Sequence, residues 1–398
     1  MVAHTIVPTP PAESATRPAA GVLLENIANK CAPAGQSVAD GIDYRAERWA
    51  ARGVLWTEST IKRCRCCGRV TITPDGSVQV RADGRAVGFA GLASCGSVWV
   101  CPVCNARVQA VRRIEVGLAL AWALVDGGAA FGAYTLCHHQ GERLGDLWPG
   151  LNKCWAAVSR DKSVRRVRAR LGWLGYVRTV EVTYGANGWH PHIHPLHLFS
   201  RPVSAAEVAE LHRVEFRAWE AAAGRLGLRT PVSAAQNLHV VDGAAAHAEV
   251  ADYFTKASYT PTAESVGWEM TSTQTKSRTR AEGSRTPWEL LRAVYLEGDA
   301  EALDLWHEWE TASRGKRAIS WSRGLRKLAG LLVEATDEEI AEREIGSRAD
   351  AGLVITDWTP IRERPQLGAE LLAVVGPAGD WDAGRLFCRR HGIEMRDA

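Results

Sequence analysis

The sequence lacks a long uninterrupted apolar run and a large net charge. Its most apolar stretch, 117–136, is broken by Asp126-Gly127-Gly128, which is typical of a helix end, a turn and a strand, not of a membrane span. The first 30 residues lack the basic start and apolar segment of a secretion signal. The 48 basic and 45 acidic residues give a net charge of +3, too small by itself to indicate a nucleic-acid binder. We therefore expect a cytoplasmic protein with no membrane partner.

The composition is that of a folded chain. Apolar residues make up 46% and charged residues 23% of the sequence, which is ordinary for globular proteins. A length of 398 residues suggests two or three domains. The composition along the chain predicts a flexible tail over 1–45, a cysteine-rich zinc module and helix over 46–128, a mixed domain over 129–262, a basic helical region over 263–345 and a C-terminal tail over 346–398.

Apolar periodicity predicts a mixed fold in the middle of the chain. Between residues 130 and 257 the pattern gives the order strand, helix, strand, strand, helix, strand, helix. We therefore expect an α+β fold in which helices cover an antiparallel sheet. The predicted strands are 130–137, 174–184, 190–199 and 237–241; the predicted helices are 105–125, 151–171, 205–226, 244–257 and 287–312.

Six of the ten cysteines fall between residues 64 and 104. In a chain expected in the cytoplasm, such clustering favours a metal site over disulfides. Two Cys-x-x-Cys pairs predict a closed, tetrahedral, structural zinc site. The predicted ligands are Cys64, Cys67, Cys101 and Cys104. The 33 residues between the pairs exceed what a compact finger needs, so Cys66 and Cys95 are rival ligands. The alternative is a set of free thiols, and a zinc module here would either grip a DNA duplex or staple a segment without a core.

A histidine-rich segment, 189–197, follows the hairpin signal Asn187-Gly188. In a strand, side chains two residues apart share a face, so His192 and His194 point the same way. If Asn187-Gly188 forms the two-residue turn, Glu181 lies opposite His194, which places a carboxylate beside two imidazoles. Two imidazoles and one carboxylate suit Mn²⁺ or Mg²⁺, with Zn²⁺ as an alternative, and leave coordination positions open.

A helix predicted from Ala244 carries a second group of reactive residues. Glu249 and Tyr253 are four residues apart and Lys256 follows three residues later, so the three share a helix face. A tyrosine hydroxyl with a pKa near 10 is a weak nucleophile, and a nearby metal and Lys would help it attack. The alternative is that Tyr253 packs in the core while its two neighbours are solvated.

The two groups together resemble the HUH endonuclease superfamily, and more narrowly the rolling-circle replication initiators (Rep proteins) of small actinobacterial plasmids. The resemblance is carried by His192-Ile193-His194, followed about sixty residues later by Glu249-x-x-x-Tyr253-x-x-Lys256. The cysteine segment 95–104 and the segment 321–326 resemble further parts of that group. The family implies an HUH, ferredoxin-like nuclease core over 129–262.

The resemblance also implies roles for the matching residues. His192, His194 and Glu181 would bind the catalytic Mn²⁺ or Mg²⁺. Tyr253 would cleave one strand of the plasmid origin, leaving a 5′-phosphotyrosyl link and a free 3′-hydroxyl that primes synthesis, and Glu249 would direct a water that ends the cycle. The implied partners are origin DNA, nicked as a single strand or hairpin, and a host helicase and polymerase.

One departure from the family pattern is Pro195, where a small apolar residue is usual. A proline removes a ladder hydrogen bond, so we expect the strand to end or bulge there. Another is Cys137, where Thr is common.

Two basic clusters, 160–170 and 314–327, would neutralise DNA phosphates. The predicted DNA contacts are Arg165, Arg166, Arg168, Arg323, Arg326 and, by stacking on an unpaired base, Trp189. The alternative for each basic cluster is a solvated surface.

Three other functions are open at this stage. The chain would be a conjugative relaxase or a transposase of the same superfamily, or a non-catalytic zinc-dependent DNA-binding regulator. A zinc hydrolase is disfavoured, because no HExxH-like motif is present.

Overall fold

The computed structural model describes residues 44–84, 86–137, 142–241, 284–331, 334–342 and 350–398. The helix predicted over 244–257, with Glu249, Tyr253 and Lys256, therefore lies outside the described residues, as does nearly all of the predicted tail over 1–45. Among the helices that are described, none is both long and apolar enough to cross a membrane.

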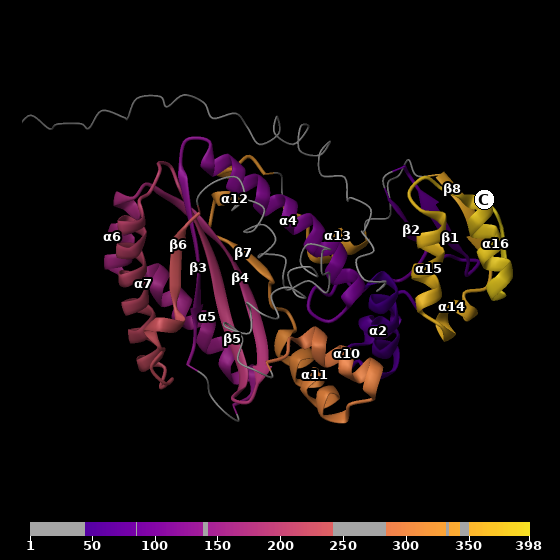
Figure 1. Ribbon diagram of the computed structural model, residues 1–398, viewed down its shortest axis with the longest axis horizontal. Helices are drawn as coiled ribbons and strands as arrows, with labels where there is room; N and C mark the ends of the chain where they lie inside the picture. The colour runs from indigo at the N-terminus through magenta and orange to yellow at the C-terminus, as the bar shows by residue number, and fades with distance from the viewer. Residues whose placement is uncertain (1–43, 85, 138–141, 242–283, 332–333, 343–349) are drawn as a thin grey trace, which may run out of the picture.

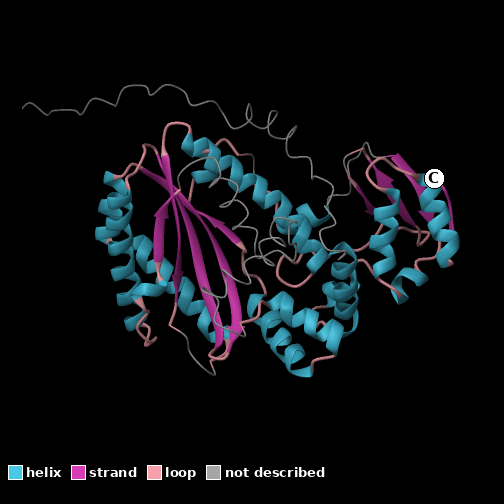
Figure 2. Ribbon diagram, viewed as in Figure 1, coloured by secondary structure: helices cyan, strands magenta, loops and turns pink. Residues whose placement is uncertain are grey.

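The larger of two sheets has five antiparallel strands in the order β6-β3-β5-β4-β7 (Figures 1 and 2). Its strands are β3 (Gly128–Thr135), β4 (Trp173–Gly185), β5 (Gly188–Phe199), β6 (Asn237–Val240) and β7 (Ile319–Trp321). The histidine strand β5 is the central one, and β4 lies beside it as predicted. The fold class is therefore the predicted one, an antiparallel sheet covered by helices.

The β4–β5 hairpin turns one residue earlier than predicted. Gly185 pairs with Gly188, so Ala186 and Asn187 form the turn, and Gly188 has the φ of +84° that glycine accommodates. Glu181 is consequently opposite His192, and the predicted pairing with His194 is wrong. The pairing moves by two residues, which keeps every side chain on its predicted face.

Three helices cover one face of this sheet: α5 (Leu144–Arg160), α6 (Lys162–Arg170) and α7 (Ala205–Arg225). The sequence predicts one helix over 151–171, but the Asp161 side chain accepts hydrogen bonds from the backbone N–H groups of Ser163 and Val164 and starts a new helix. Ser204 is the N-cap of α7 and forms a capping box with Glu207.

The second sheet has four strands in the order β2-β1-β8-β9, built from the two ends of the described chain. Its strands are β1 (Val78–Ala82), β2 (Val87–Ala90), β8 (Asp350–Ile355) and β9 (Met395–Asp397), and its helices are α14 (Thr359–Glu363), α15 (Gln366–Val375) and α16 (Trp381–His391). The prediction of a C-terminal tail over 346–398 is therefore wrong. Leu353, Ile355 and Leu371 are fully buried, so this segment completes the core around the cysteine-rich region.

Most of the remaining helices lie between the two sheets (Figure 1). They are α2 (Tyr44–Glu58), α3 (Lys62–Cys66), α4 (Pro102–Leu124), α10 (Pro287–Glu297), α11 (Ala300–Ser313), α12 (Leu325–Leu328) and α13 (Asp337–Glu342), with a 3₁₀ turn η1 (Ser233–Ala235) between α7 and β6. The single helix predicted over 287–312 is interrupted at Gly298, which has a φ of +64°.

Candidate functional site

Glu181 on β4 and His192 and His194 on β5 meet on the sheet face opposite helices α5–α7. The strand pairing places Glu181 directly across from His192 and diagonal to His194. His194 is 3% exposed, whereas the side chains of His192 and Glu181 are 15% and 24% exposed. The group is thus buried at His194 and partly exposed to solvent at His192 and Glu181.

The spacing of the three side chains suits a divalent cation. Glu181 Oε2 lies 3.1 Å from His194 Nε2 and 3.4 Å from His192 Nε2. Adjacent ligands of an octahedral ion with bonds of about 2.1 Å are about 3.0 Å apart, and those of a tetrahedral ion about 3.4 Å apart. The three residues are one of two groups in the described chain whose ligand atoms all lie within 4.8 Å of one another.

The backbone fixes the orientation of the His194 ring. His194 Nδ1 lies 3.3 Å from the carbonyl oxygen of Gly132 on β3, and an N–H at Nδ1 leaves the Nε2 lone pair directed at the ligand group. Continuing the β3–β5 register places Pro195 opposite Gly132, and Pro195 has no N–H to offer that carbonyl.

Strand β5 runs on to Phe199 despite the proline, contrary to the expectation that it ends there. Its ladder with β3 is nevertheless interrupted between the Phe131–Leu196 and Tyr134–Ile193 pairs. The interruption at Pro195 therefore frees a carbonyl beside His194.

The electrostatics favour the protonation states that metal ligands need. Burial opposes the charged form of Glu181, but hydrogen bonds with His192 and His194 outweigh it and hold the pKa of this carboxyl well below its ordinary value. Burial also lowers the pKa of His194, although Glu181 acts in the opposite direction. An ionised carboxylate and a neutral imidazole are the ligand forms.

Two further side chains, His190 and Thr135, lie on the same face as His192 and His194. His190 Nε2 hydrogen-bonds Thr135 Oγ1 at the end of β3, and the His190 and His192 rings are 5.1 Å apart. Sequence reasoning missed this pair and Gly132. The i, i+2 spacing of His190 with His192 was the available signal, whereas nothing local marked Gly132.

The second candidate metal centre is a cysteine cluster of Cys67, Cys95, Cys101 and Cys104, all buried. Their sulfurs are 3.6 or 3.7 Å apart in the three contacts Cys67–Cys101, Cys67–Cys104 and Cys95–Cys104. Ligands of a tetrahedral zinc with Zn–S bonds of about 2.3 Å are about 3.8 Å apart. The four thiols therefore fit a closed zinc site.

This set differs from the predicted one by one residue. Cys95, a rival in the sequence, takes the place of Cys64, which is buried outside the group of four, and Cys66 also lies outside it. Cys67 ends α3, while Cys101 caps α4 and Cys104 lies in its first turn. Hydrogen bonds with Cys101, Cys67 and Cys95 hold the pKa of the Cys104 thiol well below its ordinary value.

Two of the arginines predicted to contact DNA are committed to ion pairs inside the protein. Arg168 is 3% exposed and donates two hydrogen bonds to Glu215, so its predicted DNA contact is wrong. The Arg326 side chain is 14% exposed and pairs with Glu115 on α4 at 2.9 Å, so its charge is committed to this ion pair.

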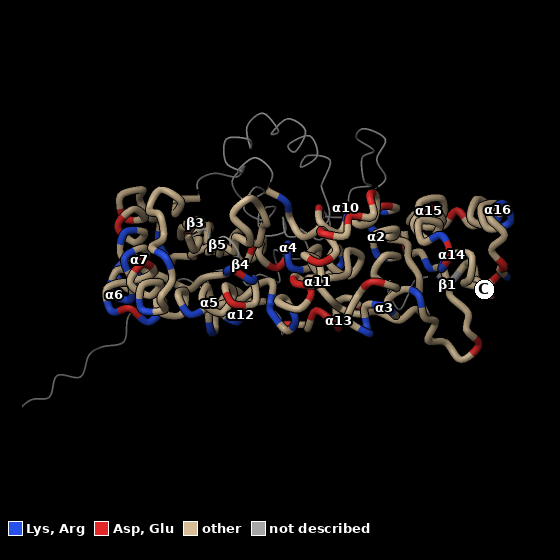
Figure 3. The backbone as a smooth tube through the Cα atoms, turned by 90° about the horizontal axis from the view of Figure 1, so that it is seen from below, with Lys and Arg blue, Asp and Glu red and all other residues tan. Residues whose placement is uncertain are grey.

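The other three predicted arginines are exposed, on different sides of the molecule. Arg165 and Arg166 lie on α6, behind the helix-covered face and away from His192 and His194, whereas Arg323 lies between β7 and α12. Figure 3 shows these two basic regions separately, at α6 and around α12. DNA contact by these three arginines stays a prediction.

Trp189 is 2% exposed, which makes its predicted stacking on a DNA base wrong. Its ring packs edge-on against Tyr184 at 5.1 Å and stacks on Trp309 at 6.4 Å. Trp189 thus packs between the hairpin and α11.

A comparison with curated proteins found two relatives. The chain is 28% identical over 378 aligned residues to "Protein rep" of Streptomyces lividans, covering 77% of this chain and 81% of that protein. It is also 34% identical over 141 residues to a "Neomycin resistance protein" of Streptomyces cyanogenus, covering 29% of this chain and 32% of that protein. No family model and no solved structure matches the chain. The similarity to the Streptomyces lividans protein, which spans most of both chains, confirms the resemblance to an actinobacterial Rep protein.

Proposed function

We propose that the chain is a plasmid rolling-circle replication initiator, a site-specific endonuclease that nicks one strand of the origin DNA through a tyrosine nucleophile. The observation that carries the proposal is the Glu181, His192 and His194 group on the open face of the sheet. The similarity to a Rep protein over 77% of the chain supports the same role. The physiological setting would be the cytoplasm, with origin DNA, a helicase and a polymerase as partners.

The three ligands would hold Mn²⁺ or Mg²⁺, which supplies charge stabilisation for the oxygens of the scissile phosphate. Glu181 contributes the negative charge, while His194 is held in its ligand orientation by Gly132. Three protein ligands leave positions for phosphate oxygens and water.

Tyr253, Glu249 and Lys256 would supply the covalent chemistry. The Tyr253 hydroxyl oxygen bonds to phosphorus, the bond from phosphorus to the 3′-oxygen breaks, and the tyrosine proton ends on that oxygen. The Lys256 ammonium would stabilise the developing phenolate. In the closing step Glu249 would accept a proton from a water that attacks the phosphotyrosyl link, which releases the tyrosine.

The cysteine cluster would hold one structural Zn²⁺. Its four sulfurs fit that ion closely, they are buried, and they join α3 to the start of α4. In this proposal the zinc supports the fold and takes no part in cleavage.

A cleavage assay tests the proposal. Protein with Mn²⁺ or Mg²⁺ is mixed with a labelled single-stranded oligonucleotide that carries the plasmid nick site, and a covalent adduct is sought on a denaturing gel. Tyr259 lies six residues after Tyr253 and serves as the control tyrosine. We expect an adduct with the wild type and with Tyr259→Phe, and no adduct with Tyr253→Phe or His192→Ala.

The remaining outcomes identify the alternatives. DNA binding without an adduct from any of these proteins would overturn the nuclease and favour the zinc-dependent regulator. An adduct that persists in Tyr253→Phe would assign the nucleophile to another tyrosine. Cleavage of a transfer origin in place of a replication origin would favour the relaxase, and of a transposon end the transposase.

A further inference from the structure

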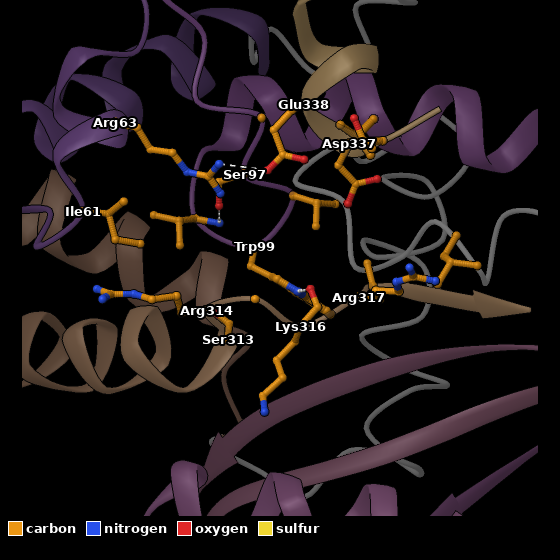
Figure 4. Close-up of a pocket in the computed structure, with 18 of the residues that line it drawn as sticks. Ile61, Arg63, Ser97, Trp99, Ser313, Arg314, Lys316, Arg317, Asp337 and Glu338 are labelled. Atoms are coloured by element: carbon orange, nitrogen blue, oxygen red, sulfur yellow. Dashed lines mark hydrogen bonds and ion pairs between the residues drawn. The ribbon is translucent and has the colours of Figure 1, made fainter. Parts of the chain in front are cut away.

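A cleft of about 640 Å³ lies between the cysteine-rich region and the segment that leads into β7. Its walls come from the start of α3, the loop before α4, the start of α13 and the segment 313–319. In Figure 4, Arg63, Asp337 and Glu338 stand on one side of the opening and Arg314 and Arg317 on the other. The cleft does not include any residue assigned above to metal binding or cleavage.

The cleft carries more positive than negative charge. Six cations and three acids line it, which gives a formal charge of +3. The three acids are already paired: Glu338 with Arg63, and both Asp337 and Glu334 with Arg112. Among the described residues, four lining cations have no ion pair: Lys62, Arg314, Lys316 and Arg317. Lys62, Arg314 and Arg317 are also exposed, so they are open to a ligand that carries several negative charges.

Buried hydrogen bonds hold the walls in place. Glu310 near the end of α11 is fully buried and accepts hydrogen bonds from the backbone N–H of Thr60 and from the Ser59 hydroxyl, just before α3. Trp99 Nε1 donates to the Lys316 carbonyl at 2.8 Å, and Trp309 Nε1 donates to the Trp99 carbonyl at 2.9 Å. These bonds tie the basic segment to the loop that carries Cys95 and Cys101, so the cleft is a built feature of the fold.

The cleft opens beside the proposed nuclease site. Ile319 lines the cleft and pairs with Thr179, and Thr179 pairs with His194. Directly paired residues share a face, so the Ile319 side chain lies on the same face as His194. Two strand spacings separate them, which is about 10 Å. A DNA strand at the metal ligands would therefore reach the cleft within a few nucleotides.

We propose that this cleft binds the phosphodiester backbone of the origin DNA next to the nick site, with Arg314 and Arg317 as its main phosphate contacts. The inference rests on the proposed function for the identity of the DNA, but it concerns a different surface. Because the contacts are to phosphate, they contribute affinity and position the strand without reading its sequence.

The test is DNA binding without added divalent cation, measured by fluorescence anisotropy at several salt concentrations. The probes are the origin oligonucleotide as a single strand and as a duplex. The cleft variant is Arg314→Glu/Arg317→Glu, and the matched control is Arg389→Glu/Arg390→Glu on α16, which changes the same charge at exposed sites outside the cleft.

For the cleft variant we expect affinity to fall at least about tenfold near 0.1 M salt. The slope of log K against log salt should flatten by about 1.4 to 1.8, as expected when two phosphate contacts are lost. A larger loss with one probe identifies whether the single strand or the duplex occupies the cleft. The control should stay within about twofold.

Binding by the cleft variant within twofold of the wild type would overturn the proposal, and so would equal losses in both variants. The nuclease proposal is judged separately, by the covalent adduct with Mn²⁺. A wild type that binds DNA through the cleft but forms no adduct would refute the nuclease alone, and a wild type that does not bind DNA would refute both.

Discussion

Strand β5 carries a histidine beside a glutamate on each of its two faces, and the two pairs differ in what neutralises them. On the helix-covered face, His197 Nε2 lies 3.5 Å from Glu215 Oε2. On the open face, His194 Nε2 lies 3.1 Å from Glu181 Oε2. Both carboxyls have a lowered pKa, to about 2 for Glu215, despite the burial that opposes their charge.

The difference lies in the cation. Glu215 is fully buried and receives two hydrogen bonds from Arg168, at 2.7 and 3.1 Å, and a third from the Tyr134 hydroxyl at 2.9 Å. Among the described residues, no Lys or Arg forms an ion pair with Glu181, whose partners are His192 and His194. Arg168 neutralises Glu215 from within the protein, whereas the partners of Glu181 are the two imidazoles that we propose as its fellow metal ligands.

Loss of the proposed zinc from the cysteine cluster should have the largest effect on stability. Cys104→Ser replaces one buried thiolate ligand, and a structural zinc of this kind contributes about 10 kcal/mol or more to folding. We expect loss of zinc and unfolding of the start of α4, measured as metal content per chain and as the thermal midpoint. Cys66→Ser, outside the cluster, is the control and should keep both. Wild-type protein that contains no zinc after purification would contradict the assignment.

Arg168→Ala removes the cation that pairs with Glu215 on the helix-covered face. It leaves Glu215 buried and uncompensated, which should cost about 3–5 kcal/mol of unfolding free energy. Urea denaturation measures this, and Arg165→Ala, exposed on the same helix, should change stability by no more than about 0.5 kcal/mol. Equal stability of the two variants would show that Arg168 is not needed to neutralise Glu215.

His194→Ala removes a proposed metal ligand beside Glu181. It should reduce the rate of cleavage more than the free energy of unfolding. With a metal ligand removed, we expect nicking to fall by about 10²–10³-fold, or about 3–4 kcal/mol of transition-state stabilisation. His197→Ala is the comparison on the other face, where the loss should fall on the unfolding free energy and spare Mn²⁺ binding. Cleavage retained by His194→Ala would remove this residue from the metal site.

Gly132→Ala tests the backbone carbonyl that orients His194. An added Cβ would lie 2.0 Å from the Asn237 carbonyl oxygen on β6, so β3 has to shift and the Gly132 carbonyl shifts with it. Loss of such an orienting contact typically costs 10–100-fold in metal affinity, measured here by Mn²⁺ titration. Gly145→Ala, whose Cβ would meet nothing within 4 Å, should leave the affinity unchanged. A wild-type affinity in Gly132→Ala would show that the carbonyl does not position the ring.

The dependence of stability on pH should be the smallest effect. The pKa of Glu215 falls from an ordinary 4.5 to about 2 on folding, so its contribution is complete above about pH 4.5 and is lost as the pH falls toward 2. The loss should be about 1.4 kcal/mol per pH unit for this group. Urea unfolding at pH 5, 4 and 3 measures it, and Arg168→Ala should flatten the slope by raising the pKa of Glu215. An unchanged slope in that variant would show that Arg168 does not lower the pKa of Glu215.

Much of the site could be predicted because it depends on local patterns. The i, i+2 spacing of His192 and His194 fixes their common face, and the Asn187-Gly188 signal marks the hairpin that brings Glu181 to them. The exact register was predicted wrongly, because Gly188 takes the position after the turn. The error of two residues was harmless only because the side-chain period is two.

The buried partners could not be predicted in the same way. Arg168 and Arg326 look like surface cations in a basic segment, and only long-range packing pairs them with Glu215 and Glu115. The same applies to Trp189, which the sequence offers to DNA and the structure places against Trp309. Charge and aromaticity are visible in a sequence, but burial depends on which elements pack together.

The sequence by itself predicted the Glu181, His192 and His194 group, the main strands of the larger sheet and the resemblance to an actinobacterial Rep protein. Tertiary structure alone decided that Cys95 joins the thiol cluster in place of Cys64, that residues 350–397 complete a second sheet, and that the Gly132 carbonyl faces His194. The physical reason is range. Periodicity and turn signals act within about ten residues. Cys67 and Cys95 are 28 residues apart in the sequence, and Val78 and Ile355, which pair in the second sheet, are 277 apart, so only the packing of the whole chain selects these contacts.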